Sequence, residues 1–513
     1  MTIDPRDIEN ATLRAQLAAA LSELASLRAS FDALVEQGAR ANERLAELTA
    51  VLLRRQRQPP KPPAPPAPAD LDDTQRAAYD ARPKPPAPTP REPKTPKPRK
   101  PTGRQALPGH LPVDEHVFRP EACAHCGGTA LDLADEVVEE KLDFIQAYHR
   151  RRVVRRKTCR CRACGERTTP RSLPAPYERA KVTSAWLAWL VHMKFSMLVP
   201  LDRLRRDLAT QGIPMAMSTL VGFIERAADL LGMIDGYHWR QLLAGKWMAT
   251  DATGLKVLVP KMKTAHNGYL EVYRRADLVV MQYEPTKDGA TVASKLASFK
   301  GTLVADAEHR YNGVYGNSGK ILEAGCNAHG RRKLRDAEAV QPALAAEGGA
   351  FISAIYQIEN SARAEGLEGD ALRKWRQGGM KPIMQDLRAW MEATKPTLLP
   401  SDPLAATIRY YENHWDALFR FVDDPRLPID NSASEREFQN VAKLRLNMLF
   451  AGGTEGAHRA AVLLGIAATC RAIGLNLQAY LTWVFDRVGT FKDVYAMPIE
   501  ALTPAAFKAL NGT

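Results

Sequence analysis

Three acidic residues stand where a metal-dependent reaction could use them. Asp251 lies in the middle of residues 246–260, KWMATDATGLKVLVP, whose alternating and β-branched residues predict a strand. The apolar run TLVA predicts a second strand and is followed by Asp306, and Glu435 lies in DNSASER at the start of a predicted helix. Because an ionised carboxylate inside a strand is costly to bury alone, we expect Asp251 to be paired or to lie at a polar site.

Carboxylates that converge from two strands and a helix can share divalent cations. Hard cations such as Mg²⁺ take oxygen ligands and retain several waters. Two such ions about 3.5–4 Å apart can stabilise the attacking and leaving oxygens of a phosphodiester. The alternative for Glu435 is a capping box with Ser432, in which the glutamate only reaches back to the backbone N–H of the cap residue.

Two Cys-x-x-Cys pairs, each followed by glycine, predict a zinc ribbon over residues 113–170. Four thiolates at such spacing form a tetrahedral structural Zn²⁺ site. The expected ligands are Cys123, Cys126, Cys161 and Cys164, and Cys159 is a rival ligand because it lies beside the second pair. Five of the seven cysteines fall in this segment, which favours a metal site in a reducing cytoplasm over a disulfide framework.

The chain is basic, with a net charge of +13 and a pI of 9.4. This balance favours a polyanionic partner, nucleic acid first. Beside the predicted ribbon, Arg155, Arg156 and Lys157 belong to a basic cluster for which we expect phosphate contact, with a solvated charged face as the alternative. No apolar run reaches the roughly 18–20 residues that span a bilayer, and no signal peptide is evident, so we expect a cytoplasmic protein without a membrane partner.

The first 112 residues carry no predicted globular domain. Residues 1–56 repeat apolar side chains at heptad spacing, including Leu17, Leu24 and Leu45, and predict a coiled coil that joins two or more chains. The alternative is an amphipathic helix docked on its own chain. Residues 57–112 are rich in Pro and Lys, which predicts an extended, disordered linker.

A helical domain is predicted over residues 171–240. Leu204 and Leu208 mark one helix, QGIP interrupts the pattern, and Ser218 can cap a second helix. Two helices joined by a glycine-containing turn have the outline of a DNA-binding helix-turn-helix, although such hairpins also occur without DNA.

An α/β core is predicted over residues 241–330 and 425–475. Three strands that can form a meander are predicted at residues 246–260, 268–274 and 278–283. A helix and the strand before Asp306 follow them. Residues 331–424 are helical in pattern and interrupt the core as an insertion, and residues 476–513 form a helical tail.

Four stretches of the chain resemble the insertion sequence 66 family of bacterial DDE transposases, of the TnpC type. They are TDATGLKVL, TLVADAEHRYNGVY, EAGCNAHGRRKL and IDNSASEREFQNVAKLRLNMLFAGGTEGAHRAA. The resemblance runs in order from about residue 107 onward, and its most specific part is residues 430–461.

The resemblance implies a ribonuclease-H-like core, so the expected fold is multidomain α/β, with the coiled coil, linker, zinc ribbon and helical domain ahead of the core. It implies that Asp251, Asp306 and Glu435 are an acidic triad that holds two Mg²⁺ or Mn²⁺ ions. The implied reaction hydrolyses the DNA strand at the transposon ends and transfers the 3′-hydroxyl into target DNA. The implied partners are terminal inverted repeats, target DNA and small accessory proteins of the same element.

Further residues near the expected metal site are candidates for DNA contact. The candidates for phosphate contact are His329, Arg331, Arg332, Lys443 and Arg445. Cys326 and His329 could suggest a metal ligand pair, but two such ligands without partners are more often structural. Trp415 is expected either to pack in a core or, if exposed, to stack on a base extruded from the cleaved end.

Two other functions share the predicted binding features. One is a DNA-binding repressor or decayed copy without catalysis, which has no need of three carboxylates. The other is a metal-dependent nuclease without strand transfer, which a joining assay distinguishes. In each case we expect association with the bacterial nucleoid, because the basic charge favours nucleic acid.

Overall fold

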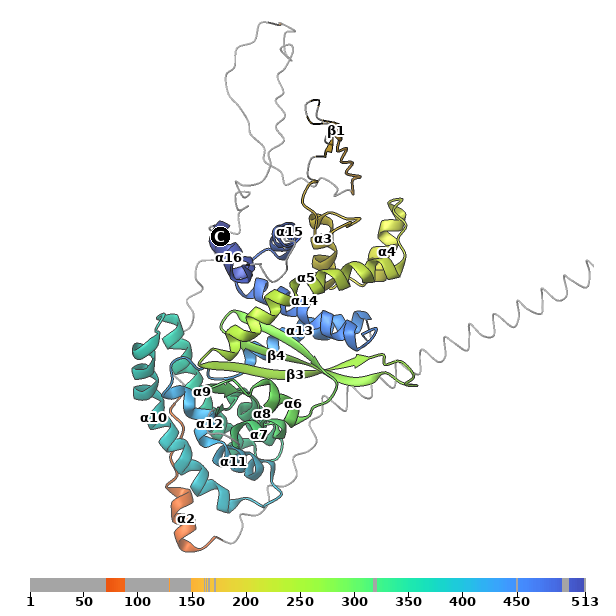
Figure 1. The fold of residues 1–513 in the computed structure, drawn as a ribbon. Coiled ribbons are helices and arrows are strands. Elements are labelled where there is room, and N and C mark those ends of the chain that lie inside the picture. Colours follow the sequence, from red (N-terminus) through yellow and green to blue (C-terminus); the bar gives the residue numbers. More distant parts are fainter. Residues whose placement is uncertain are drawn as a thin grey trace, which may run out of the picture. The chain divides into compact units, whose positions relative to one another are not determined.

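The computed structural model describes parts of the chain that form two compact units (Figure 1). The described residues are 71–87, 129, 149–160, 162, 164, 167–169, 172–316, 321–448, 451–490 and 498–511. We call Pro86–Cys326 with Asp416–Thr513 the sheet unit, and Met1–Pro85 with Asn327–Trp415 the helical unit. The coiled coil predicted over residues 1–56 lies outside the described residues.

The sheet unit contains a five-stranded sheet with the order β5-β4-β3-β6-β7. Its strands are β3 (Trp247–Val257), β4 (His266–Arg275), β5 (Leu278–Glu284), β6 (Thr302–Val304) and β7 (Leu322–Ala324). The first three form an antiparallel meander, and β6 and β7 continue the sheet parallel to β3. The predicted meander and the strand before Asp306 are confirmed. The short β7 was not predicted, because three residues show no alternation.

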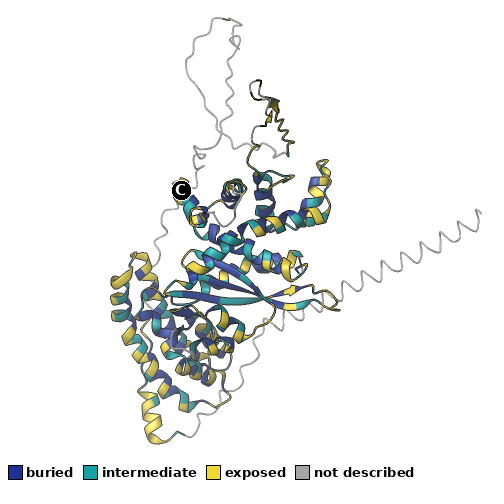
Figure 2. Ribbon diagram, viewed as in Figure 1, coloured by how far each residue is buried: buried dark blue, intermediate teal, exposed yellow. Residues whose placement is uncertain are grey.

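Alternation along β3 divides the sheet into two apolar faces. Met248 packs in one cluster with Leu303, whereas Leu255 and Val257 belong to another. The first face is covered by α6 (Gly289–Lys295), η1 (His309–Tyr311) and α7 (Asn312–Gly316), and the second by α5 (Met217–Leu243), α13 (Ser432–Met448) and α14 (Thr454–Ala472) (Figure 1). Near its start, β3 is covered on both faces, and residues 248–250 are buried (Figure 2).

Helix α5 joins the sheet to further helices of this unit through one hydrophobic core. These are α3 (Ser184–Phe195), α4 (Leu201–Thr210), α15 (Leu477–Val488), η5 (Ile499–Leu502) and α16 (Pro504–Asn511). The predicted turn between α4 and α5 is present, with Gly212 at a φ of 75°, where a side chain would be strained. Ser218 does not cap α5, because the helix already begins at Met217 after Ala216. The predicted helix-turn-helix segment thus shares a core with the sheet.

The helical unit packs α9 against α8 and α10. Its helices are α2 (Asp73–Asp80), α8 (Asn327–Ala337), α9 (Pro342–Ala364), α10 (Gly369–Thr394), η2 (Lys395–Thr397) and α11 (Pro403–Asn413), and α12 (Trp415–Phe419) and η3 (Arg420–Val422) follow. Arg376 of α10 and Glu359 of α9 form a buried ion pair with nitrogen–oxygen distances of 2.7 and 2.8 Å. The helical pattern predicted for residues 331–424 is present.

Helix α2 interrupts the linker predicted over residues 57–112. The Asp72 carboxylate accepts the Gln75 N–H at 2.7 Å, and the Gln75 side chain accepts the Asp72 N–H in return, which completes a capping box. Arg82 then pairs with Glu347 of α9 at 3.2 Å. The helix forms here because the sequence from Ala69 to Arg82 contains no proline and supplies its own cap.

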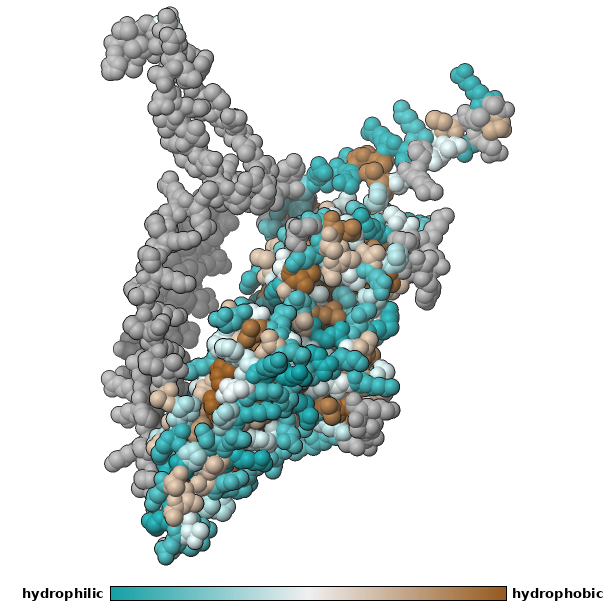
Figure 3. All heavy atoms as spheres, turned by 90° about the vertical axis from the view of Figure 1, so that its left-hand side faces the viewer, coloured by the Kyte–Doolittle hydropathy of each residue, from teal (hydrophilic) through white to brown (hydrophobic). Residues whose placement is uncertain are grey.

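No helix of the described residues is long and apolar enough to cross a membrane. The long helices bury one face and expose the other (Figure 2). On the side of the molecule drawn in Figure 3, hydrophobic residues lie in separate patches among hydrophilic ones. The apolar side chains are thus mostly used in the cores of the two units.

Glu437 of α13 ties three elements of the sheet unit together. Its side chain is 8% exposed and accepts hydrogen bonds from Arg274 of β4, at 2.7 Å, and from Arg471 of α14. Removing the charge from this carboxylate leaves two guanidinium groups without the anion that they share.

We therefore expect Glu437→Gln to lower the free energy of unfolding of the sheet unit by about 2–3 kcal/mol. A lower melting temperature in differential scanning fluorimetry would show the change. Glu338→Gln, at an exposed position, is the matched control and should shift the free energy by less than about 0.5 kcal/mol. Equal melting of both variants and the unmodified chain would contradict the structural role of Glu437.

Candidate active site

Asp251 and Asp306 are brought together by the register of two parallel strands. Ala249 of β3 is paired with Val304 of β6. Each aspartate follows its member of this pair by two residues, and side chains alternate along a strand, so both leave the same face of the sheet at the same level. The pairing of β3 with β6 ends at Ala249 and Val304, so both aspartates lie just beyond the paired residues.

Asn431 positions the start of α13 beside Asp251. Its side-chain amide donates to the backbone carbonyl of Thr250 at 2.8 Å, and its backbone N–H donates to the Cys326 Sγ at 3.2 Å. Asn431 is 1% exposed, so both contacts are shielded from water. The first turn of α13, which carries Glu435, is thereby fixed against the strand that carries Asp251.

The capping box considered for Glu435 does not match the position at which α13 begins. A capping box requires Ser432 in the cap position. The helix instead begins at Ser432, and the Asn431 carbonyl accepts the N–H groups of Ser434 and Glu435 at 2.9 and 3.2 Å. The Ser432 N–H donates to Asp430 Oδ1 at 2.9 Å. The cap position is therefore occupied by Asn431.

The three carboxylates are close enough to affect one another's charge. The pKa of Asp251 is raised to about 6, chiefly by burial and further by the negative charges of Asp306 and Glu435. The Ala252 N–H, which donates to Asp251 Oδ1 at 2.7 Å, and the Arg310 guanidinium act in the opposite direction. Carboxylate oxygens are the ligands that a hard divalent cation takes, and such a cation would compensate the charge of the three groups.

A buried polar network supports the segment that follows Asp306. Arg310 Nη1 donates to Glu271 of β4 at 2.7 Å, and Glu271 also accepts from Tyr273, at 2.8 Å, and from Lys295, at 2.7 Å. Glu271 is paired with Ala252 across the strands, so it leaves the face of the sheet opposite to Asp251. The network thus anchors the segment after Asp306 from the other side of the sheet.

Sequence reasoning missed both Asn431 and Glu271. The rule that identified Asp251, that a carboxylate within a strand needs a partner, applies equally to Glu271 in the strand HNGYLEVYRR. Asn431 had a weaker signal. It lies one residue before the predicted helix, where an amide side chain can cap the helix. Its side chain instead donates a hydrogen bond to Thr250 of β3.

The basic residues of α13 differ in their surroundings. Lys443 is exposed, as expected for a residue that contacts phosphate. Arg445 is half-buried and donates from Nη1 to the carbonyl of Gly254 at 2.6 Å, so it holds the helix to β3. The exposed Arg155, Arg156 and Lys157 precede β1 (Cys159–Arg160) and are farther along the chain from the carboxylates.

Three other candidates for phosphate contact lie in the helical unit, which begins at Asn327 and so includes the end of the segment predicted as core. His329 of α8 is half-buried, and Arg331 and Arg332 are exposed. Arg331 lies over the ring of Tyr356, 5.5 Å from its centroid. The contacts with DNA phosphate that we expect of these three residues stay predictions.

Trp415 is neither fully buried nor fully exposed. The Arg388 guanidinium lies over its ring, 5.2 Å from the centroid. A base that stacked on this face of the indole would have to displace the arginine. The expectation of base stacking therefore stays a prediction.

Two of the five cysteines in the predicted ribbon are described. Cys159 lies on β1, which pairs with β2 (Arg167–Thr168), and Cys164 lies in the turn between these strands. Both are exposed free thiols. Cys123, Cys126 and Cys161 are outside the described residues, so the choice between Cys159 and Cys161 as a zinc ligand stays a prediction.

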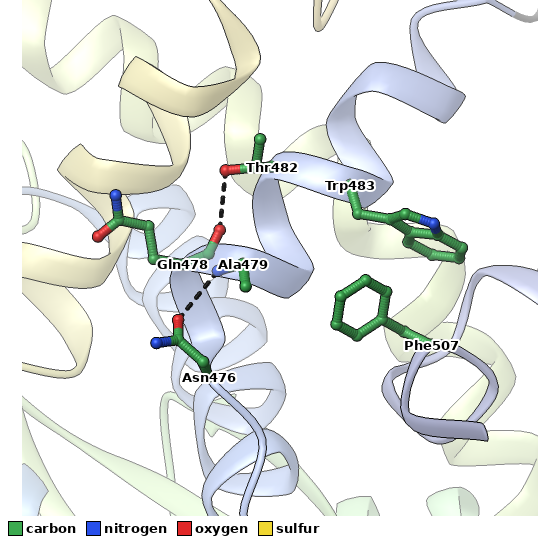
Figure 4. A pocket seen from close by; sticks show the side chains of 6 residues that line it. All are labelled: Asn476, Gln478, Ala479, Thr482, Trp483 and Phe507. Carbon is green, nitrogen blue, oxygen red and sulfur yellow. Dashed lines mark hydrogen bonds between the residues drawn. The ribbon is translucent and has the colours of Figure 1, made fainter. Parts of the chain in front are cut away.

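A cavity of about 600 Å³ lies elsewhere, between α15 and α16 (Figure 4). Its lining residues are Asn476, Gln478, Ala479, Thr482, Trp483 and Phe507. The Trp483 and Phe507 rings are in edge contact, with centroids 5.1 Å apart and an interplanar angle of 61° (Figure 4). Because no carboxylate, histidine or cysteine lines it, this cavity is not suited to metal-dependent chemistry.

Comparison with known proteins agrees with the geometry. Residues 179–459 match the Transposase IS66 family, and residues 120–165 match the zinc-finger binding domain of transposase IS66. Two proteins of Sinorhizobium fredii are similar to the chain over most of their length. The protein y4qI is 27% identical over 98% of this chain and 95% of its own length. The protein y4jD is 28% identical over 79% of this chain and 82% of its own length.

The family match covers more than half of the chain and includes Asp251, Asp306 and Glu435. The second match spans the four cysteines expected to bind zinc. Together they imply DNA as a partner, DNA cutting and joining as the activity, and zinc as a cofactor. The chain belongs to the IS66 family of transposases.

Proposed function

We propose that this transposase cuts and joins DNA at a site formed by Asp251, Asp306 and Glu435. The observation that carries the proposal is geometric: the register of β3 with β6 aligns Asp251 with Asp306, and Asn431 fixes the first turn of α13, which carries Glu435, to the same strand. In the proposed reaction, one strand is hydrolysed at each transposon end, and the freed 3′-hydroxyl is transferred into target DNA. The same site serves both steps, because each is a substitution at phosphorus.

The core is proposed to be ribonuclease-H-like. The sheet order, with three antiparallel strands followed by two strands parallel to β3, supports this assignment. The first acidic residue is on the central strand, the second follows the neighbouring parallel strand, and the third is on a helix over the same sheet.

The three carboxylates would hold two Mg²⁺ or Mn²⁺ ions. When bound, the ions would supply positive charge to the attacking and leaving oxygens of the phosphodiester. The protein's part is to keep the ligands in place. The register of β3 and β6 aligns Asp251 with Asp306, and Asn431 fixes the helix that carries Glu435.

Other parts of the chain are proposed to bind and pair the DNA ends. The zinc ribbon, with Arg155, Arg156 and Lys157 beside it, and helices α4 and α5 would contact the terminal inverted repeats. Residues 1–56 would join two or more protomers across two ends. Small accessory proteins of the same element are further proposed partners, and the nucleoid in the bacterial cytoplasm is the proposed location.

The catalytic proposal predicts opposite behaviour for Glu435 and Glu437, two glutamates that lie two residues apart in α13. Glu435→Gln should reduce strand cleavage at least about 100-fold without lowering the melting temperature, because glutamine cannot supply the negative charge that the metals need. Glu437→Gln, the matched control on the same helix, should lower the melting temperature but retain cleavage by the folded fraction. The measurement is cleavage and joining of a plasmid that carries this gene with its flanking DNA.

Near-normal cleavage by Glu435→Gln would remove this residue from the site. Cleavage without joining by the unmodified chain would instead favour a nuclease. Loss of cleavage in both variants in proportion to their loss of folded protein would mean that the effect is structural.

The raised pKa of Asp251 predicts how pH affects stability. The folded-state pKa of about 6 exceeds the ordinary value of 3.8, so the charged form destabilises the fold above pH 6, and this effect disappears as pH falls toward 4. In EDTA at pH 8, Asp251→Asn should therefore raise the free energy of unfolding by about 1–3 kcal/mol, and the gain should shrink at pH 5. Melting temperatures at the two pH values measure it.

With added Mg²⁺ at pH 8, the unmodified chain should instead be more stable than Asp251→Asn, because the ion stabilises the unmodified site and not the asparagine variant. A variant that melts lower than the unmodified chain in EDTA at pH 8 would contradict the repulsion among the carboxylates. The same titration should show weaker Mg²⁺ stabilisation below pH 6, where Asp251 becomes protonated.

The zinc proposal predicts about one Zn²⁺ per purified chain, bound by Cys123, Cys126, Cys161 and Cys164. Cys161→Ser should release the metal, whereas Cys159→Ser, the matched control, should retain it. Elemental analysis by mass spectrometry measures both. If Cys161→Ser retained Zn²⁺ and Cys159→Ser lost it, Cys159 and not Cys161 would be the ligand.

A further inference from the structure

The β3–β4 tip, which we define as residues 256–266, is a basic projection at the end of the sheet. Strands β3 and β4 continue past β5 as a two-stranded hairpin, and the distal part of this hairpin is exposed (Figures 1 and 2). The exposed lysines of the tip are Lys256, Lys261 and Lys263. The sequence from Gly254 to Gly268 contains no acidic residue, and no carboxylate of the described residues pairs with these lysines.

Two apolar side chains are exposed among the lysines. Leu258 is 40% exposed and Met262 is 52% exposed. Apolar side chains flanked by cations on a narrow projection suit a DNA groove, because the cations contact phosphates and the apolar groups contact sugars or bases.

The tip is held to the body of the sheet unit. The Leu258 N–H donates to the carbonyl of Ala451 at 2.9 Å, and the Ala451 N–H donates to the carbonyl of Lys256 at 2.8 Å. Arg445 of α13 holds the same strand at Gly254. A projection fixed in this way can position DNA relative to the carboxylates, which a freely moving loop cannot.

Lys261 occupies a backbone conformation that disfavours a long side chain. Its φ is 69°, in the left-handed region that glycine and asparagine adopt most easily. A lysine at such a position opposes local stability by about 1 kcal/mol. The side chain is exposed and makes no ion pair within the described residues, so it offers no compensating contact inside the protein.

We infer that the β3–β4 tip is a clamp that contacts duplex DNA about seven base pairs from the phosphodiester bond that is cut. Leu258 is seven residues beyond Asp251, which corresponds to about 23 Å along an extended strand. The rise of DNA is about 3.4 Å per base pair, so the tip meets the backbone about seven base pairs away. The distance from the cut rests on the proposed function, because it is measured from Asp251. The binding of DNA by the tip does not.

The test uses the full-length chain with Asp251→Asn, which cannot cleave, and a fluorescent random-sequence duplex of 40 base pairs. The clamp variant adds Lys256→Ala, Lys261→Gly and Lys263→Ala. Lys261→Gly removes a charge and relieves the backbone, so it should not unfold the tip. We expect the slope of log affinity against log salt to fall by about 2–3, because each lost phosphate contact contributes about 0.9.

The matched control removes three positive charges from exposed lysines outside the tip, through Lys181→Ala, Lys300→Ala and Lys374→Ala. Its slope should change by less than half as much. An equal change in the control, or an unchanged slope in the clamp variant, would overturn the inference. Loss of self-association in the clamp variant with DNA binding intact would identify a second copy of the chain as the occupant and would also overturn it.

Met262→Ala tests the apolar contact separately. It should weaken binding severalfold while leaving the salt slope unchanged, because no phosphate contact is lost. In the cleaving chain, the effect of the clamp variant should disappear on substrates trimmed to fewer than about seven base pairs on one side of the cut. Cleavage by the unmodified chain is required for this last arm alone, so failure of the proposed function leaves the binding result interpretable.

Discussion

The placement of three carboxylates together in a partly buried site is the constraint that the rest of the sheet unit has to meet. Asp251, Asp306 and Glu435 share a partly buried place, and the pKa of Asp251 is raised to about 6 as a result of burial and of its two neighbours. Such a group would separate if its supports were loose. The strand register and the Asn431 contacts hold it together, as a preformed site requires.

The supports lie on both sides of the sheet. On the side of Asp251, the start of α13 is fixed by Asn431 and the middle of that helix by Glu437, which binds Arg274 and Arg471. On the opposite side, Glu271 gathers Arg310, Tyr273 and Lys295 and anchors the segment after Asp306. Two of these supports use charges of their own. The fold thus combines three carboxylates proposed as metal ligands with acidic supports that are neutralised by arginine and lysine.

Much of this arrangement can be predicted from the sequence. The strand around Asp251 and the strand before Asp306 show clear alternation or apolar runs, and the helix around Glu435 has a polar start. Contacts between distant segments are harder to predict. Asn431 resembles an ordinary cap residue in the sequence, and only the fold shows that its amide reaches Thr250, 181 positions away. The short β7 and the helix α2 within a proline-rich region were missed because local pattern is weak over so few residues.

The most direct test of the account is to locate the metal. Crystals of the full-length chain soaked in Mn²⁺ can be measured at a wavelength where manganese scatters anomalously. We predict anomalous peaks bounded by the carboxylates of Asp251, Asp306 and Glu435, and no peak there in crystals of Glu435→Gln at the same Mn²⁺ concentration. Peaks at other acidic groups, or a peak at Asp251 and Asp306 that is unchanged in the Glu435 variant, would contradict it.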